Sequence, residues 1–93
     1  MTQTKKIYTI VYTKKADKQL DKINDKKLLL KLESIIEQLK INPYAPVHKF
    51  ERLKGKGTRC SMRLTQKDRL YYEVFDDKVL VLVLSILGHY EDN

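Results

Sequence analysis

The stretch VLVLVLSILGHY, from Val79 to Tyr90, constrains the fold of this chain more than any other segment. Its first nine residues are Val, Leu or Ile apart from Ser85, and no polar side alternates with the apolar one. This pattern is typical of a strand that is covered on both faces, so we predict a central strand here. Because Gly88, His89 and Tyr90 follow directly, the strand would deliver an imidazole and an aromatic ring to the rim of its sheet.

The length of the chain, 93 residues, allows one modest core, and we expect a single domain over residues 1–93. The single cysteine, Cys60, cannot form an internal disulfide, which favours a reducing cytoplasm. The N-terminal apolar run is too short for a signal peptide, and the run from Val79 to Leu87 is too short to span a bilayer. The sequence therefore predicts a soluble cytoplasmic protein that has no membrane partner.

The charge of the chain is strongly basic, with 19 Lys and Arg against 12 Asp and Glu and a formal net charge of +7. A balance of this sign favours polyanionic partners, because bound phosphates are neutralised and their counterions are released. Composition alone does not separate nucleic acid from an acidic protein. The charge can also serve only solubility.

The first half of the chain predicts one strand and two helices. Residues Ile7 to Tyr12 are rich in β-forming types and predict a strand near a sheet edge. Thr13 can cap a helix from Lys14 to Ile23, whose apolar stripe is narrow. Asp25 can cap a stronger helix from Lys26 to about Lys40, which has one broad apolar face.

The second half predicts four strands after a connecting loop over residues 41–49. A short strand is expected at Phe50 to Leu53, and the alternation from Thr58 to Leu64 predicts a second one. Arg69 to Phe75 predicts a third strand, which leads into the central one.

This order of elements, β-α-α-β-β-β-β, predicts an α+β domain in which two N-terminal helices pack on one face of a mainly antiparallel sheet. The opposite face stays open. The residues expected to face the helices are Cys60, Met62, Leu64, Leu70, Tyr72 and Val74, and those expected on the open face are Arg59, Ser61 and Arg63.

Seven candidate site residues lie on or beside this open face, and they supply one acid, one imidazole, one aromatic ring and several cations. That inventory fits cleavage of an RNA phosphodiester, in which a base deprotonates the 2′-hydroxyl, cations stabilise the phosphate and an acid protonates the leaving oxygen. Each also has a plain structural role available, as a solvated ion-pair partner, an edge charge or an aromatic plug. The candidates are Glu51, Lys54, Arg59, Arg63, Arg69, His89 and Tyr90.

Other chemistries fit the sequence less well. Cys60 should point into the core, which disfavours a reactive thiol. His48 and His89 have no cysteine or carboxylate at ligand spacing, so we expect no metal site. Three scattered glycines make no phosphate-binding loop, and we expect no cofactor.

Three segments, NPYAPVHKFERLKG, SMRLTQKDRLYYEV and the GHY near the C-terminus, together resemble the YoeB/Txe branch of the RelE superfamily. These bacterial toxins are ribosome-dependent endoribonucleases, the mRNA interferases of toxin–antitoxin systems. The resemblance covers residues 42–90 well. It implies a RelE-like fold and, as partners, the ribosome with its mRNA and a cognate antitoxin, within a homodimer or a toxin–antitoxin hetero-oligomer.

The resemblance also implies a role for each candidate residue. Glu51 is similar to the family's general base, His89 to its general acid, and Arg69 to the arginine that stabilises the scissile phosphate. Lys54 and Arg63 match basic positions of the RNA pocket, and Tyr90 matches a tyrosine that positions the nucleotide.

The sequence departs from the family pattern around these positions. Phe50 and Arg52 replace the prolines on either side of the glutamate, Met62 stands in place of a second arginine, and Cys60 replaces an aromatic residue. Two other hypotheses remain open: a non-catalytic toxin of the same fold that acts by binding, as gyrase-directed relatives do, and a basic nucleic-acid-binding module.

Overall fold

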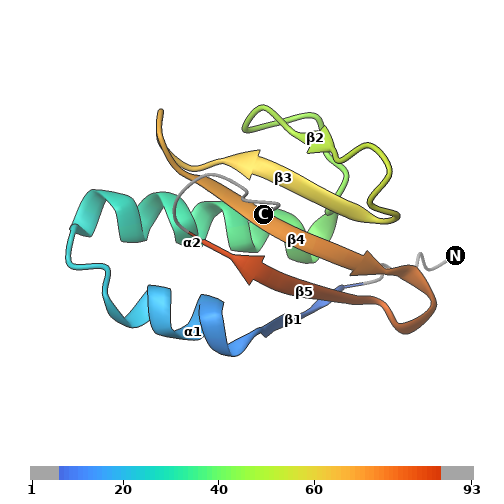
Figure 1. The fold of residues 1–93 in the computed structure, drawn as a ribbon, viewed down its shortest axis with the longest axis horizontal. Coiled ribbons are helices and arrows are strands. Elements are labelled where there is room, and N and C mark those ends of the chain that lie inside the picture. The colour runs from blue at the N-terminus through green and yellow to red at the C-terminus, as the bar shows by residue number, and fades with distance from the viewer. Residues whose placement is uncertain (1–6, 87–93) are drawn as a thin grey trace, which may run out of the picture.

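The structure, a computed structural model, describes residues 7–86, and it confirms the predicted order of one strand, two helices and four strands (Figure 1). Two helices separate the first strand from the rest, and a short 3₁₀ turn, η1, precedes the last strand. The elements are β1 (Thr9–Tyr12), α1 (Lys14–Asp21), α2 (Lys26–Ile41), β2 (Glu51–Arg52), β3 (Arg59–Arg63), β4 (Arg69–Phe75), η1 (Asp76–Lys78) and β5 (Leu80–Ser85).

The five strands form one mixed sheet in the order β1-β5-β4-β3-β2. The first strand pairs with the last in parallel, with Thr9 opposite Leu80, and the other three pairings are antiparallel. The predicted position of β1 at an edge is therefore confirmed. As predicted, β5 is an interior strand, although β4 occupies the middle position.

Both helices begin at the predicted N-caps. The Thr13 side chain accepts a hydrogen bond from the Ala16 amide at 3.1 Å, and the Asp25 carboxylate accepts one from the Lys27 amide at 2.9 Å. Helix α1 ends two residues before the predicted boundary, because the amides of Lys22 and Ile23 bond three residues back and tighten the final turn.

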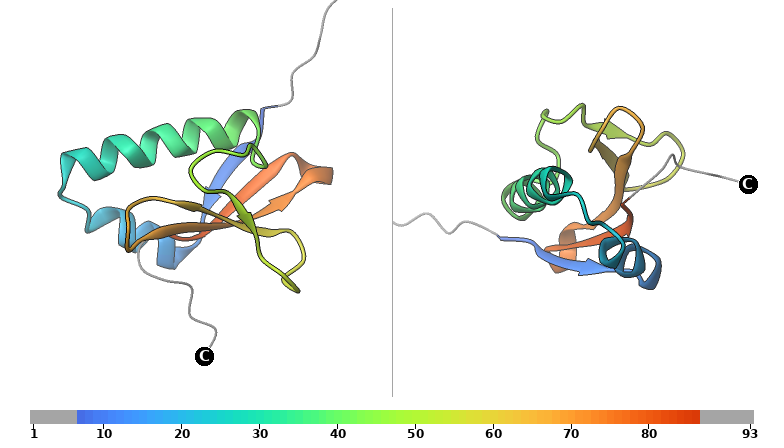
Figure 2. Two further views of the ribbon diagram at one scale, coloured as in Figure 1. Left: turned by 90° about the horizontal axis from the view of Figure 1, so that it is seen from above. Right: turned by 90° about the vertical axis from the view of Figure 1, so that its left-hand side faces the viewer.

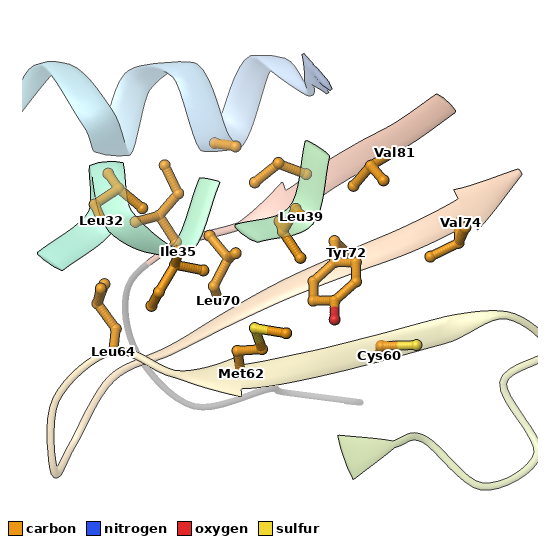
Figure 3. Close-up of a cluster of buried hydrophobic side chains, with 13 residues drawn as sticks. Leu32, Ile35, Leu39, Cys60, Met62, Leu64, Leu70, Tyr72, Val74 and Val81 are labelled. Atoms are coloured by element: carbon orange, nitrogen blue, oxygen red, sulfur yellow. The ribbon is translucent and has the colours of Figure 1, made fainter. Parts of the chain in front are cut away.

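The core lies between the helices and one face of the sheet, and α2 runs along that side in Figure 2. Figure 3 shows the side chains of α2 interdigitating with those of β3, β4 and β5. Alternate residues of these strands face the helices, so the inward pattern predicted from the sequence is confirmed. The buried set includes Leu32, Ile35 and Leu39 of α2 and Cys60, Met62, Leu64, Leu70, Tyr72, Val74, Val81 and Val83 of the sheet region.

The last strand differs from its prediction in two respects. It begins at Leu80, because Val79 has a left-handed φ of 49° where the chain leaves η1. Its two faces are also unequal: Val81 and Val83 are fully buried against the helices, whereas Leu82 on the other face is only half-buried. The prediction that both faces of this strand are covered was wrong for Leu82, because both helices within residues 7–86 pack on the opposite face of the sheet.

The loop between α2 and β2 is fixed to the sheet at both of its ends. The Tyr72 hydroxyl donates a hydrogen bond to the Pro43 carbonyl at 2.6 Å, and the Arg63 amide donates one to the His48 carbonyl at 2.6 Å. His48 and Lys49 both have positive φ values, 52° and 54°, which turn the chain sharply into β2. Strand β2 is consequently shorter than predicted, with two residues.

Candidate active site

The predicted site residues of β2, β3 and β4 share the sheet face opposite the helices. In the register of these strands, Glu51 lies opposite Ser61, and Ser61 lies opposite Tyr71. Arg63 lies opposite Arg69 on the same face, because side chains alternate along each strand. Three neighbouring strands therefore bring residues from distant parts of the chain to one surface.

Glu51 and Arg69 approach each other across β3. The Arg69 Nη1 atom lies 4.0 Å from the Glu51 Oε1 atom, at the outer limit of an ion pair. The Glu51 side chain is 66% exposed and that of Arg69 is 25% exposed, so the carboxylate stands open to a ligand while the guanidinium is largely enclosed. This arrangement combines a proton acceptor with a fixed positive charge.

Two polar atoms beside this pair are buried without a hydrogen-bond partner in the part of the chain that the structure describes. They are the Arg63 Nε and the Ser61 Oγ. Ser61 was expected on the open face, and the register places it there between Glu51 and Tyr71, yet it is fully buried. An unpartnered guanidinium nitrogen retains its capacity to donate a hydrogen bond to a phosphate oxygen.

The other two predicted cations lie farther along the hairpin that β2 and β3 form. The Arg59 Nε atom is 3.4 Å from the Glu73 Oε1 atom, so an acidic residue of β4 already engages this arginine. Lys54 is exposed in the turn of the hairpin, where Gly55 and Gly57 adopt φ values of 70° and 63°. The structure brings together Glu51, Arg63 and Arg69. The predictions for His89 and Tyr90 lie outside the described residues.

Tyr44 is not among the seven residues predicted for the site, yet it contacts both neighbours of Glu51. Its ring meets the Phe50 ring edge-on, with centroids 6.4 Å apart, and the Arg52 guanidinium carbon lies 4.9 Å from its centroid. Its hydroxyl donates a hydrogen bond to Asp76 at 2.7 Å. The sequence offers one signal of this cluster: Tyr44 is an aromatic residue in the loop, and an aromatic and a cationic residue, Phe50 and Arg52, stand on either side of Glu51.

Burial shifts the pKa of four groups around the loop in the direction that favours the neutral form. Burial, and then the hydrogen bond to Asp76, raises the pKa of Tyr44, and burial also raises the pKa of Tyr72. The pKa of His48 is lowered, first by burial and then by the charge of Lys31. Burial raises the pKa of the Cys60 thiol, as expected of an inert core cysteine.

Among residues 7–86, no group of three or more His, Cys, Asp or Glu side chains is placed to hold a metal ion. Within the same span, neither helix has the length and apolar character needed to cross a membrane.

The architecture and the open-face cluster of Glu51, Arg63 and Arg69 can be compared with known proteins. A family model described as the YoeB-like toxin of bacterial type II toxin–antitoxin systems matches residues 12–90. The chain belongs to this family. A comparison of the toxin with curated protein sequences gives no match.

Solved structures resemble the toxin over most of its length. The YoeB/ParE toxin from Agrobacterium tumefaciens has a TM-score of 0.77 and 27% identity, over 88% of this chain and 99% of that chain. The YoeB dimer from Staphylococcus aureus has a TM-score of 0.72 and 26% identity, over 89% and 98%. YoeB has also been solved in a heterotetrameric complex with YefM from the same organism, with the same scores.

More distant relatives share the fold alone. The toxin resembles a chain of the intact RelBE toxin–antitoxin complex of E. coli with a TM-score of 0.75 at 22% identity, over 90% of this chain and 99% of that chain. The predicted RelE-like α+β fold is thus confirmed, as is the predicted membership of the YoeB branch.

Proposed function

We propose that this toxin is a ribosome-dependent endoribonuclease that cleaves translating mRNA by acid–base catalysis without a metal ion. Glu51 takes the proton from a ribose 2′-hydroxyl, and the 2′-oxygen attacks the adjacent phosphorus. His89 donates a proton to the 5′-oxygen as its bond to phosphorus breaks. The products are a 2′,3′-cyclic phosphate end and a 5′-hydroxyl end.

Positive charge on the open face stabilises the pentacoordinate phosphate in this proposal. Arg69 neutralises the non-bridging oxygens, and Arg63 lies directly opposite it in the register of β3 and β4. Lys54 and Arg59 hold the flanking RNA backbone, and Tyr90 positions a nucleotide base. The observation that carries the proposal is the 4.0 Å approach of the Arg69 Nη1 to an exposed Glu51 carboxylate on one sheet face.

The test compares two carboxylates of the same sheet face. Glu51→Gln keeps the shape of the side chain but removes its basicity, and it should slow mRNA cleavage in a translating extract by about 10²- to 10⁴-fold. Glu73→Gln is the matched control. Glu73 also contacts an arginine of this sheet face, Arg59, but it has no part in the proposed proton transfers. Primer extension on the message measures both rates, and His89→Gln should behave like Glu51→Gln.

Other outcomes of this test separate the proposal from its alternatives. Undiminished cleavage by Glu51→Gln removes this residue from the mechanism. Growth arrest that persists in both Glu51→Gln and His89→Gln, with intact mRNA, points to a toxin that acts by binding. DNA damage during that arrest identifies a gyrase-type target, and RNA binding with steep salt dependence identifies a basic binding module.

We also propose that a cognate antitoxin covers the open face of the sheet. YoeB of S. aureus has been crystallised in a heterotetrameric complex with YefM, and RelE of E. coli within an intact RelBE complex. The net charge of +7 suits an acidic antitoxin as well as RNA. Co-purification with the product of a neighbouring short, acidic reading frame would test this partner.

A further inference from the structure

We propose that Tyr44 is the positioning residue of Glu51, which it holds in place through the residues on either side. The catalytic consequence rests on the role proposed above for Glu51, whereas the structural claim stands on contacts alone. Strand β2 is otherwise weakly restrained. It has two residues and lies at the edge of the described sheet, where β3 is the one strand within residues 7–86 that pairs with it.

The Glu51 side chain does little to fix its own position. It is 66% exposed, and within residues 7–86 its single ion-pair contact is the Arg69 Nη1 atom at 4.0 Å. A general base must nevertheless stay within hydrogen-bond reach of the proton that it removes. Its placement therefore has to come from the backbone on which it is carried.

The two residues that flank Glu51 both contact Tyr44. Phe50 meets the ring edge-on at a centroid distance of 6.4 Å and an interplanar angle of 87°, and the Arg52 guanidinium carbon lies 4.9 Å from the ring centroid. Side chains alternate along an extended chain, so residues 50 and 52 point to one side and residue 51 to the other. A single ring thus holds both neighbours and turns Glu51 toward the open face.

The Tyr44 ring is itself anchored to the rest of the fold. Its hydroxyl donates to the Asp76 Oδ2 at 2.7 Å, and Asp76 lies in η1, directly after the middle strand of the sheet. The Tyr44 amide donates to the Asn42 side chain at 3.0 Å, and the preceding Pro43 carbonyl accepts from the Tyr72 hydroxyl. The ring is thereby held from its backbone and from its hydroxyl, and it connects β2 to the turn that follows the end of β4.

The fold supplies its own control for this connection. Tyr8 donates a hydrogen bond to the other oxygen of the same carboxylate, Asp76 Oδ1, also at 2.7 Å. Tyr8→Phe and Tyr44→Phe therefore each remove one hydroxyl from Asp76. Only Tyr44 also contacts Phe50 and Arg52, so only its variants should affect Glu51.

The experiment measures Glu51 placement in two independent ways. Hydrogen exchange of a peptide covering residues 50–53 reports the order of β2 without reference to activity. Single-turnover cleavage of ribosome-bound mRNA, at saturating and at limiting toxin, separates the chemical rate from ribosome binding. The variants are Tyr44→Leu, Tyr44→Phe and Tyr8→Phe, each compared with the wild-type toxin.

Tyr44→Leu removes the ring and should raise exchange of this peptide and lower the saturated cleavage rate by about 10- to 100-fold, with ribosome binding unchanged. Tyr44→Phe keeps both ring contacts and should restore most of the rate, to within about threefold to tenfold of wild type. Tyr8→Phe should leave both measurements at wild-type values.

Equal behaviour of Tyr44→Phe, Tyr44→Leu and Tyr8→Phe overturns the proposal, as does unchanged exchange of residues 50–53 in Tyr44→Leu. A general loss of folding would raise exchange in the core peptides of α2 as well, and it would likewise count against a local role. A third outcome is that Tyr44→Leu raises the hydrogen exchange of residues 50–53 while Glu51→Gln still cleaves mRNA. In that case Tyr44 positions Glu51 as proposed, and the assignment of Glu51 as the general base fails.

Discussion

The two faces of the sheet differ in the contacts that their side chains make. On the helix side, apolar side chains from α2, β3, β4 and β5 interdigitate, and most are fully buried. On the open side, charged residues meet across strands at longer range, as Glu51 and Arg69 do at 4.0 Å. The covered face gains its stability from area removed from water, whereas the open face holds charges whose contribution to stability is small.

This contrast means that stability and activity should be separable by face. A change on the helix side should lower the free energy of unfolding, and a change on the open side should lower the rate of cleavage. The three predictions below test this separation, from the largest expected effect to the smallest.

Leu39→Ala should lower the free energy of unfolding by about 2–5 kcal/mol, because Leu39 is fully buried and its truncation leaves a cavity. Leu30→Ala is the matched control on the same helix, since Leu30 is 65% exposed, and it should change stability by less than about 0.5 kcal/mol. Urea denaturation followed by circular dichroism measures both. Equal losses in the two variants would contradict the position of the core.

Arg69→Ala should lower the cleavage rate by about 10²- to 10³-fold, because it removes the positive charge that we propose stabilises the phosphate. Its free energy of unfolding should change by less than about 1 kcal/mol, since Arg69 also faces the like charge of Arg63 across the strands. Lys40→Ala on α2, which removes a cation paired with Glu37, should leave cleavage unchanged. A loss of stability in Arg69→Ala comparable to that of Leu39→Ala would contradict the claim that the two sheet faces contribute separately to stability and to activity.

The smallest effect concerns pH. The pKa of His48 is lowered by burial and by Lys31, so the folded chain favours neutral imidazole. The resulting stability is fully present above the unfolded pKa of about 6.5 and is lost as pH falls through the lower, folded value. Thermal melting between pH 7 and pH 5 should therefore show a steeper decline for wild type than for His48→Gln. Parallel curves would mean that His48 is equally solvated in both states.

The sequence predicted the covered face well and the open face in part. Periodicity alone identified Met62, Leu70 and Tyr72 as inward residues, because a strand with one buried face must alternate. Alternation also assigned Arg63 to the opposite face. It could not reveal that Arg63 lies opposite Arg69, because pairing depends on strand register.

The contacts of Tyr44 were beyond sequence reasoning for a similar reason. Phe50 and Arg52 stand where the resembling family has prolines, and nothing local shows that a ring several residues upstream contacts both. The left-handed backbone of Val79 was missed as well, since a β-branched residue rarely adopts it and the aliphatic run continues through it. The exposure of Leu82 was missed because the run looks apolar on both faces.

The parallel pairing of β1 with β5 sets the order in which the toxin can mature. Thr9 and Leu80 are neighbours in the sheet although most of the chain lies between them. During synthesis, β1 must therefore wait for its partner until β5 has left the exit tunnel. A nascent chain therefore carries an unpaired β1 and an incomplete sheet until β5 has been made and can dock beside it.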